Sequence, residues 1–131
     1  MIFIDSNILI YSYSSTEIGK KDKMLLILEN EEITISTQVI NEFIWIMSRK
    51  YNVDMESLKV INNNLFEIFN VGMVSKATID KAIDIAKRYK YAYWDSLMLS
   101  SALESRCIAI YSEDMQHGQI IEGIKIINPF L

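Results

Sequence analysis

Four carboxylate side chains stand at places in the sequence where they could share one chemical task. Asp5 directly follows a short apolar run at residues 1–4, and Asp114 follows a second run of this kind. Asp95 lies near the start of a strongly apolar helical segment, and Glu42 lies about one turn into another predicted helix. Oxygen ligands without a histidine or cysteine pair favour a hard cation such as Mg²⁺ or Mn²⁺. The four acids together therefore predict a cation site.

Each acid also has a simpler explanation when it is taken alone. Asp5 could only cap a helix, Asp95 near a helix start is favoured by the helix dipole, Asp114 could fix a turn, and Glu42 could be a solvated surface group. The helix that Asp95 opens is, however, too apolar to lie at the surface. A carboxylate desolvated there needs a partner, and no arginine stands beside it in the sequence. A shared cation satisfies this need.

The elements that must position these acids alternate between strands and helices. Residues 1–4 suit a strand buried on both faces, and residues 33–35, 71–74, 108–111 and 124–127 give further predicted strands. Predicted helices cover about residues 16–30, 38–50, 54–69, 75–89 and 94–105. The alternation predicts an α/β fold, with a parallel sheet of four or five strands and helices on both faces. Since ligands bind beyond the carboxyl ends of such strands, we expect the four acids at one edge of the sheet.

Length and charge limit the classes of protein that fit. The 131 residues show no linker or internal repeat, so residues 1–131 are predicted to form one domain. The net charge of −4 excludes a nucleic-acid binder that depends on bulk positive charge. Any nucleic acid must be held by metal ions or by local basic groups. The candidates are Lys20, Lys21, Lys23, Arg49, Lys50, Lys87, Arg88 and Lys90.

Cysteine content and hydropathy indicate a compartment. The single cysteine, Cys107, cannot form an internal disulfide, which fits a reducing cytoplasm. No apolar run reaches the ~18 residues of a membrane span, and the N-terminus lacks the basic region of a signal peptide. We therefore expect a cytoplasmic protein without a membrane partner.

Three segments carry a resemblance to a known family. They are residues 4–11 (Ile-Asp-Ser-Asn-Ile-Leu-Ile-Tyr), residues 94–102 with Trp-Asp-Ser-Leu at their start, and residues 111–118 (Tyr-Ser-Glu-Asp-Met-Gln-His-Gly). Together with Glu42 in Val-Ile-Asn-Glu and the closing Ile-Asn-Pro-Phe, they resemble PIN-domain ribonucleases, and more narrowly VapC-type toxins of toxin–antitoxin pairs. Ser6 stands where the family often has threonine, and Gly118 stands near where some members place another acid.

This resemblance implies a single PIN-like domain that hydrolyses RNA phosphodiester bonds with Mg²⁺ or Mn²⁺ and thereby blocks translation. The implied catalytic residues and metal ligands are Asp5, Glu42, Asp95 and Asp114. The register of the motif favours Asp114 over its neighbour Glu113. Around the ligands we expect the polar side chains of Ser6, Asn7 and Ser112. The resemblance also implies a cognate antitoxin, whose peptide covers the active-site groove, and a homodimer.

A run of five apolar residues at positions 43–47 also suggests a partner surface, because one core cannot bury five consecutive side chains. The alternative is that the next helix, residues 54–69, covers the extra face.

Two other functions remain open from the sequence. The chain could be a non-catalytic interaction module that keeps the PIN fold and the acids. It could also be a receiver-like signalling domain, in which an aspartate accepts a phosphoryl group with the help of Mg²⁺. A receiver-like domain normally carries its acceptor aspartate after the third strand. The predicted third strand, residues 71–74, is instead followed by Ser75 and Lys76, which argues against this alternative.

Overall fold

The computed structural model describes all residues from 1 to 131. Its centre is a six-stranded sheet with the strand order β3-β2-β1-β4-β6-β5. Five strands are parallel to their neighbours, and β5 alone runs antiparallel, against β6. The strands are β1 (Ile2–Ile4), β2 (Ile33–Ser36), β3 (Asn70–Gly72), β4 (Ala109–Tyr111), β5 (Ile120–Ile121) and β6 (Ile124–Ile127). The parallel α/β sheet expected from the sequence is thereby confirmed, with one antiparallel strand added at its edge.

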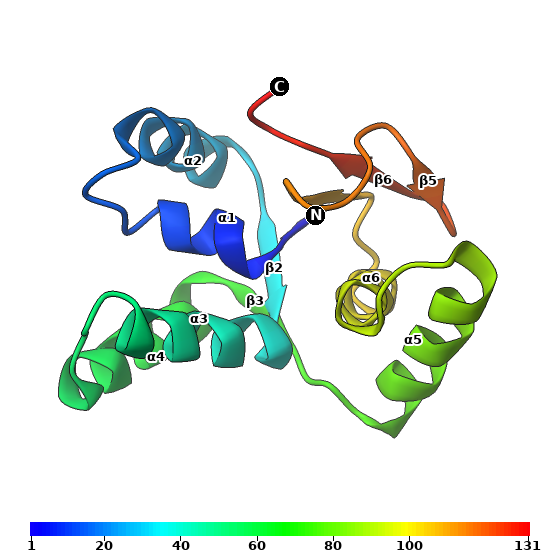
Figure 1. The fold of residues 1–131 in the computed structure, drawn as a ribbon, viewed down its shortest axis with the longest axis horizontal. Coiled ribbons are helices and arrows are strands. Elements are labelled where there is room, and N and C mark those ends of the chain that lie inside the picture. Colours follow the sequence, from blue (N-terminus) through cyan, green and yellow to red (C-terminus); the bar gives the residue numbers. More distant parts are fainter.

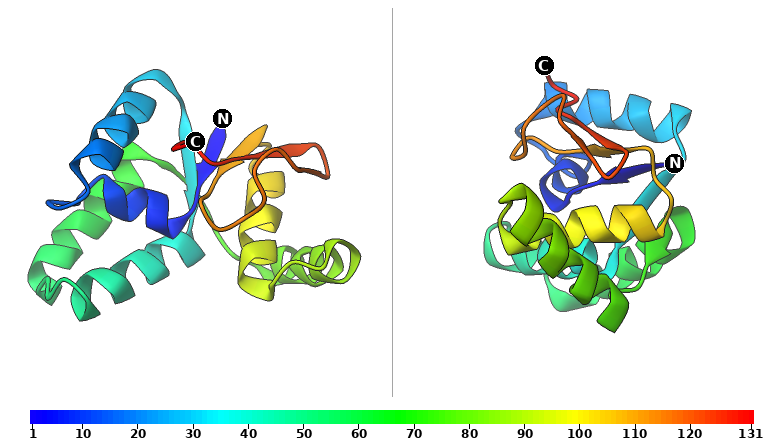
Figure 2. Two further views of the ribbon diagram at one scale, coloured as in Figure 1. Left: turned by 45° about the horizontal axis from the view of Figure 1, so that its top comes forward. Right: turned by 90° about the vertical axis from the view of Figure 1, so that its right-hand side faces the viewer.

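Six helices cover the two faces of this sheet. Figures 1 and 2 show α1 to α4 on one side and α5 and α6 on the other. The helices are α1 (Ser6–Tyr11), α2 (Ile18–Asn30), α3 (Thr37–Arg49), α4 (Met55–Ile68), α5 (Lys76–Tyr89) and α6 (Tyr93–Glu104). Helices on both faces bury the strands from both sides, which explains why β1 is wholly apolar and buried. None of the helices combines the length and the apolar character needed to cross a membrane.

Local capping chemistry determines where the helices begin. The side chains of Ser36, Asp54 and Ser75 accept hydrogen bonds from backbone N–H groups in the first turns of α3, α4 and α5. At α1 the side chains of Ser6 and Asn7 could also have capped the helix, but neither does so. Asp5 itself is the N-cap, and its Oδ1 accepts from the N–H of Ile8 at 3.0 Å.

Two further expectations are corrected by the structure. The third strand begins at Asn70 and ends at Gly72, one to two residues earlier than predicted. A Cβ atom at Gly72 would lie 3.2 Å from Ser105 Oγ, so glycine permits this close approach. On α5 the helical periodicity of the sequence favours Ile79 and Ile83 as inward residues, but both are exposed. The buried side chains of α5 are instead those of Thr78, Ala82 and Ile85.

The order of the strands positions the candidate site. The chain turns from β1 to β2 on one side, and β4 packs against the other side of β1. The sheet therefore has its topological switch point between β1 and β4, which is where open α/β sheets bind ligands at their carboxyl edge. Asp5 directly follows β1, and Ser112 directly follows β4.

Candidate active site

Asp5 is the most buried of the four acids. Its side chain is only 2% exposed, although it lies at the carboxyl end of a central strand. Burial raises the pKa of Asp5 from 3.8 to about 6, and the nearby charges of Asp114 and Asp95 act in the same direction. Hydrogen bonds from Ser112 and from the backbone of Ile8 partly oppose that increase in the pKa. Asp5 thus caps α1 and also belongs to a group of like charges.

Glu42 reaches the same edge from α3. Its carboxylate accepts a hydrogen bond of 2.8 Å from Gln38 Nε2 at one oxygen, and one of 3.3 Å from Ser6 Oγ at the other. The side chain is half-buried, and burial raises the pKa of Glu42 despite these two donors. The charge of Asp95 adds to this increase. The two hydrogen bonds fix the orientation of the carboxylate.

Asp95 lies in the first turn of α6, on the opposite face of the sheet from Glu42 and α3. Burial raises the pKa of Asp95, and so does the charge of Asp114. The first turn of α6 has no side-chain cap, and the preceding carbonyl, that of Trp94, accepts a 3.0 Å hydrogen bond from Gln38 Nε2. Gln38 therefore connects the helix that carries Glu42 to the helix that carries Asp95.

Asp114 lies in the loop after β4, and it is the most exposed of the four. Asn7 Nδ2 donates to Asp114 Oδ2 at 3.1 Å, and the backbone N–H of Asp114 donates to Ser112 Oγ at 3.1 Å. Ser6, Asn7 and Ser112, the three polar residues expected around the ligands, thus each contact one of the acids.

Glu113 has different surroundings from Asp114. Lys20 Nζ forms an ion pair with Glu113 Oε2 at 2.9 Å and donates to Tyr11 Oη at 3.2 Å. Burial alone would raise the pKa of Glu113, but hydrogen bonds from Tyr11 and Lys20 outweigh it and lower the pKa below its ordinary value. The carboxylate of Glu113 is therefore already compensated by protein groups, whereas that of Asp114 is not.

The four predicted acids form one electrostatically coupled group. The charge of Asp95 acts on Asp5 and on Glu42, and the charge of Asp114 acts on Asp5 and on Asp95. None of the four forms an ion pair with a lysine, arginine or histidine. At the same time, no three acidic, histidine or cysteine side chains lie close enough together to make a ready set of metal ligands. The acids converge on one edge, but they do not form a closed cage.

The donor set fits a divalent hard cation. The side chains that approach one another offer carboxylate, hydroxyl and amide oxygens, which suit Mg²⁺ or Mn²⁺ rather than a metal that prefers sulfur or imidazole. Mg²⁺ retains several waters and needs only one or two carboxylates, so a cage of three acids is not required. A cation would also supply the positive charge that the protein does not place beside Asp5, Glu42 and Asp95.

Gln38 is a residue of this site that its sequence position did not reveal. The side chain is 7% exposed, and both hydrogens of its amide are used, one on Glu42 and one on the carbonyl of Trp94. The available signal was its position four residues before Glu42, since side chains at this spacing are neighbours on a helix. The contact with Trp94 joins residues 56 positions apart, and no local pattern indicates it.

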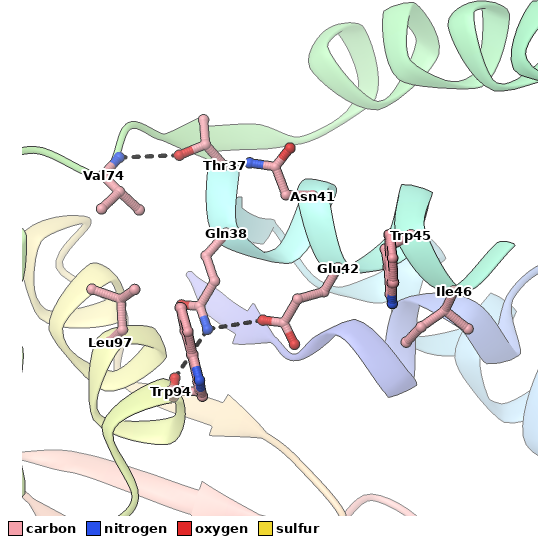
Figure 3. A pocket seen from close by; sticks show the side chains of 9 residues that line it. All are labelled: Thr37, Gln38, Asn41, Glu42, Trp45, Ile46, Val74, Trp94 and Leu97. Atoms are coloured by element: carbon pink, nitrogen blue, oxygen red, sulfur yellow. Dashed lines mark hydrogen bonds between the residues drawn. The ribbon is translucent and has the colours of Figure 1, made fainter. Parts of the chain in front are cut away.

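A cavity of about 470 Å³ adjoins Glu42. It lies between α3 and the start of α6, and Figure 3 shows the side chains that line it. The indole rings of Trp45 and Trp94 stand on either side of the Gln38–Glu42 pair (Figure 3). A largely apolar cavity is thus continuous with the acidic edge.

Comparison with known proteins bears on the family and on the fold. The family profile of the PIN domain matches residues 2–120. No curated protein matches the chain.

Several solved structures share the fold over almost the whole chain. The toxin VapC20 of Mycobacterium tuberculosis, described as cleaving the sarcin–ricin loop, is 12% identical at a TM-score of 0.71, over 87% of this chain and 90% of that one. A chain of a toxin–antitoxin complex from Klebsiella pneumoniae is 19% identical at a TM-score of 0.73, over 98% of both chains. A chain of FitAcB from Neisseria gonorrhoeae is 13% identical at a TM-score of 0.71, over 99% of both chains. At these identities the likeness is one of fold.

Proposed function

Since the chain belongs to the PIN-domain family, we propose that it is a metal-dependent endoribonuclease and the toxin of a toxin–antitoxin pair. One observation supports this proposal above the others. Three carboxylates with raised pKa values, those of Asp5, Glu42 and Asp95, influence one another at the carboxyl edge of the sheet and have no cationic partner in the protein. A structural role alone would favour compensated carboxylates, as at Glu113.

In this proposal Asp5, Glu42, Asp95 and Asp114 hold the cation, which is Mg²⁺ or Mn²⁺. When bound, such an ion offsets the negative charge of the phosphodiester and makes a nearby water more acidic. The expected products carry a 5′-phosphate and a 3′-hydroxyl.

The protein's own contribution is positioning. Ser6 and Gln38 hold the Glu42 carboxylate from two sides, Asn7 holds Asp114, and Ser112 contacts both Asp5 and the backbone of Asp114. Burial keeps Asp5 away from bulk water, which strengthens the electrostatic interactions of its carboxylate.

The proposed partners follow from the same family. Solved structures with this fold include toxin–antitoxin complexes, and this supports a cognate antitoxin for the present chain. An RNA-cleaving toxin acts where translation occurs, so a cytoplasmic location belongs to the proposal.

The homodimer implied by the resemblance stays a prediction, to be tested by sedimentation. Of the apolar run at 43–47, Phe43 and Met47 are buried, Ile44 and Ile46 are half-buried, and Trp45 is 61% exposed. The surface that this run offers to a partner is therefore narrower than the sequence suggested.

A cleavage assay tests the proposed activity. Purified protein is incubated with a panel of structured RNAs in Mg²⁺, in Mn²⁺ and in EDTA, and cuts are mapped on gels. We expect cleavage with either ion and none in EDTA. Asp95→Asn should slow cleavage by at least about a hundredfold, because it removes a charge from the proposed ligand set.

The matched control is Asp84→Asn, which removes the same charge from an exposed position on α5 that forms no ion pair. It should cleave at the wild-type rate. Equal cleavage by the wild type and Asp95→Asn in EDTA would disprove a metal-dependent site at these acids. A folded protein that cuts no RNA under any condition would favour the non-catalytic PIN-fold module.

A further inference from the structure

The cavity beside Glu42 has the features of a binding site for a flat, aromatic ligand. Its walls include Trp45 on α3 and Trp94 at the start of α6, together with the apolar side chains of Ile46 and Leu97 (Figure 3). Trp45 is 61% exposed and Trp94 is 63% exposed. Exposed apolar side chains that gather around one cavity often mark a binding site. Two of them around one cavity of about 470 Å³ form a stacking surface that the fold leaves open.

The polar part of the wall is rich in hydrogen-bond acceptors. Gln38 uses both of its N–H groups within the protein, on Glu42 and on the carbonyl of Trp94, so its amide orientation is fixed. The remaining oxygen, Gln38 Oε1, is buried and has no hydrogen-bond partner in the folded chain. An unpartnered buried acceptor is unfavourable unless a ligand donates to it. Among the lining side chains, Asn41 is exposed and offers both a donor and an acceptor.

The charges around the cavity suit an RNA chain. Glu42, a proposed cation ligand, is itself part of the wall, so an occupant of the cavity would lie next to the proposed reaction centre. The guanidinium of Arg49 lies 4.6 Å from the centre of the ring of Trp45, which lines the cavity. Arg49 was a candidate contact for the nucleic-acid backbone, and here it places a positive charge at the rim of an otherwise acidic region.

We propose that this cavity binds an unpaired nucleobase of the RNA substrate, adjacent to the phosphate that is cut, by stacking on Trp94 and Trp45. This proposal rests on the proposed ribonuclease function and adds to it a site that selects the substrate. Stacking on aromatic side chains is how proteins hold single-stranded RNA whose bases have left the helix.

The acceptor-rich wall gives the site a base preference. Adenine and cytosine carry an exocyclic amino group that can donate to Gln38 Oε1 or to Glu42. Uracil has no amino group: its only donor on this edge, N3–H, lies between two carbonyl oxygens, which would face the same acceptors. We therefore expect adenine and cytosine to bind about tenfold more tightly than uracil, the difference expected when one buried polar group loses its partner.

Intrinsic fluorescence tests the proposal directly, because Trp45 and Trp94 are the only two tryptophans of the chain. The full-length protein in EDTA, where no cleavage is expected, is titrated with the RNA hexanucleotides of adenosine, cytidine and uridine. An abasic hexanucleotide with the same phosphates is the control. Stacking should quench the tryptophan emission with the adenosine and cytidine hexamers, more weakly with the uridine hexamer, and not at all with the abasic one.

Variants identify the residues, with affinity measured by anisotropy of a fluorescein-labelled adenosine hexamer. Trp94→Leu should weaken binding by about tenfold, whereas Trp94→Phe, which keeps an aromatic face, should stay within about threefold of the wild type. Trp45→Leu gives a second test if Trp94→Leu does not fold. The matched control is Phe66→Leu, since Phe66 is an exposed aromatic residue on α4 outside the cavity, and it should leave the affinity unchanged.

The outcomes separate this proposal from the ribonuclease function. Base-dependent quenching that needs Trp94, with no RNA cut in Mg²⁺ or Mn²⁺, would support the base site and disprove the ribonuclease. Metal-dependent cleavage with equal binding of abasic and adenosine hexamers would disprove the base site alone. Equal binding of all three base-bearing hexamers would overturn the role given to Gln38. The proposal would also be overturned if sedimentation showed that Trp94→Leu and Trp45→Leu abolish a dimer while their affinity for the hexamer stays unchanged. The cavity would then be a contact between subunits.

Discussion

Glu113 and Asp114 are adjacent acids with opposite surroundings, and this contrast leads to a prediction about the active site. Glu113 is paired with Lys20, whereas Asp114 accepts a hydrogen bond from Asn7 and its charge acts on Asp5. We expect Asp114→Asn to reduce RNA cleavage by at least about tenfold, because a proposed ligand loses its charge. Glu113→Gln should retain most of the activity. Initial rates on one RNA, at several Mg²⁺ concentrations, measure both. If Glu113→Gln is the more damaging change, the motif register that selects Asp114 is wrong.

The raised pKa of Asp5 predicts a pH dependence of stability in the absence of metal. In the unfolded chain the carboxyl ionises near 3.8, but in the folded chain it ionises only near 6. Below both values Asp5 is protonated in either state and carries no electrostatic penalty. As the pH rises through this window, the unfolded chain gives up its proton first, so the folded state loses stability. The shift corresponds to roughly 3 kcal/mol once the pH exceeds about 7.

Asp5→Asn should remove this dependence, since an amide does not ionise but can still cap α1 through its oxygen. Urea unfolding in EDTA, at about pH 4 and about pH 7.5, measures the free energy of unfolding of both proteins. Relative to wild type, the variant should gain stability between the two pH values. If the free energy of unfolding changes by the same amount in both proteins between the two pH values, burial does not hold Asp5 in its protonated form.

Most of the proposed site residues could be predicted from the sequence because their signals are local. A carboxylate directly after a buried strand, as at Asp5, or in the first turn of an apolar helix, as at Asp95, is recognisable without coordinates. Gln38 could not be recognised in this way, because its role depends on a tertiary contact between α3 and α6. The paired state of Glu113 likewise depends on Lys20, which is 93 residues away in the chain.

At the scale of elements, Lys20 connects the loop that carries Asp114 to α1 and α2. Lys20 on α2 pairs with Glu113 in this loop, donates to Tyr11 on α1 and lies 5.2 Å from the ring centre of Phe130 near the C-terminus. Both members of the ion pair are only partly exposed, so this pair should contribute somewhat more than a fully exposed ion pair does.

Lys20→Met should therefore loosen the loop after β4 and reduce cleavage by about tenfold, while the melting temperature falls by only a few degrees. The fall should appear in kcat at saturating RNA, because the loop positions a ligand. Lys21→Met is the matched control, since it removes the same charge from the neighbouring residue, which has no ion pair. An equal loss in both variants would indicate that the positive charge of α2 matters rather than the contact with the loop.

The elements that were misread have short or ambiguous signals. The antiparallel β5 contains only Ile120 and Ile121, too few residues for a periodic pattern. Its hairpin turn, Glu122 and Gly123, has positive φ at both residues, which is the turn type that favours glycine. On α5 the apolar residues Ile79 and Ile83 formed a plausible inward stripe, but the buried face is shifted by one position. The buried Thr78 accounts for this shift, because it hydrogen-bonds to Glu104 and its carbonyl accepts from Ser100 on α6.

At the scale of the whole molecule, the parallel topology brings acidic residues from separate parts of the sequence to one edge of the sheet. β1 lies between β2 and β4, so the segments after these strands meet at one edge. α6 begins at the same edge from the other face of the sheet and brings Asp95. The sequence predicted this convergence because strand and helix alternation implies a parallel sheet. It could not predict how far apart the acids remain, since that distance depends on where α3 and α6 begin relative to each other at this edge.

The convergence of acids has a consequence for the stability of the whole domain. A pair of like charges about 4 Å apart repels by about 4 kcal/mol at an effective dielectric constant near 20, and wider spacing weakens this but does not remove it. Burial and mutual repulsion already raise the pKa values of Asp5, Glu42 and Asp95. Removing one charge should reduce the electrostatic repulsion among the acids. Asp95→Asn is therefore expected to stabilise the metal-free protein at a pH above the raised pKa of Asp5, which is about 6.

Metal binding should also stabilise the wild type, because the cation offsets the negative charges of the acids. An ion at 100 times its dissociation constant adds about 2.7 kcal/mol to the free energy of unfolding, which for 131 residues raises the melting temperature by several degrees. Asp95→Asn should respond less, because it lacks one ligand. Thermal melts of both proteins are compared in about 10 mM Mg²⁺ and in a monovalent salt of equal ionic strength. If the four acids are unrelated caps and surface groups, Asp95→Asn will be slightly less stable than wild type and Mg²⁺ will act only as salt. That result would remove the basis for a shared metal site at this edge of the sheet.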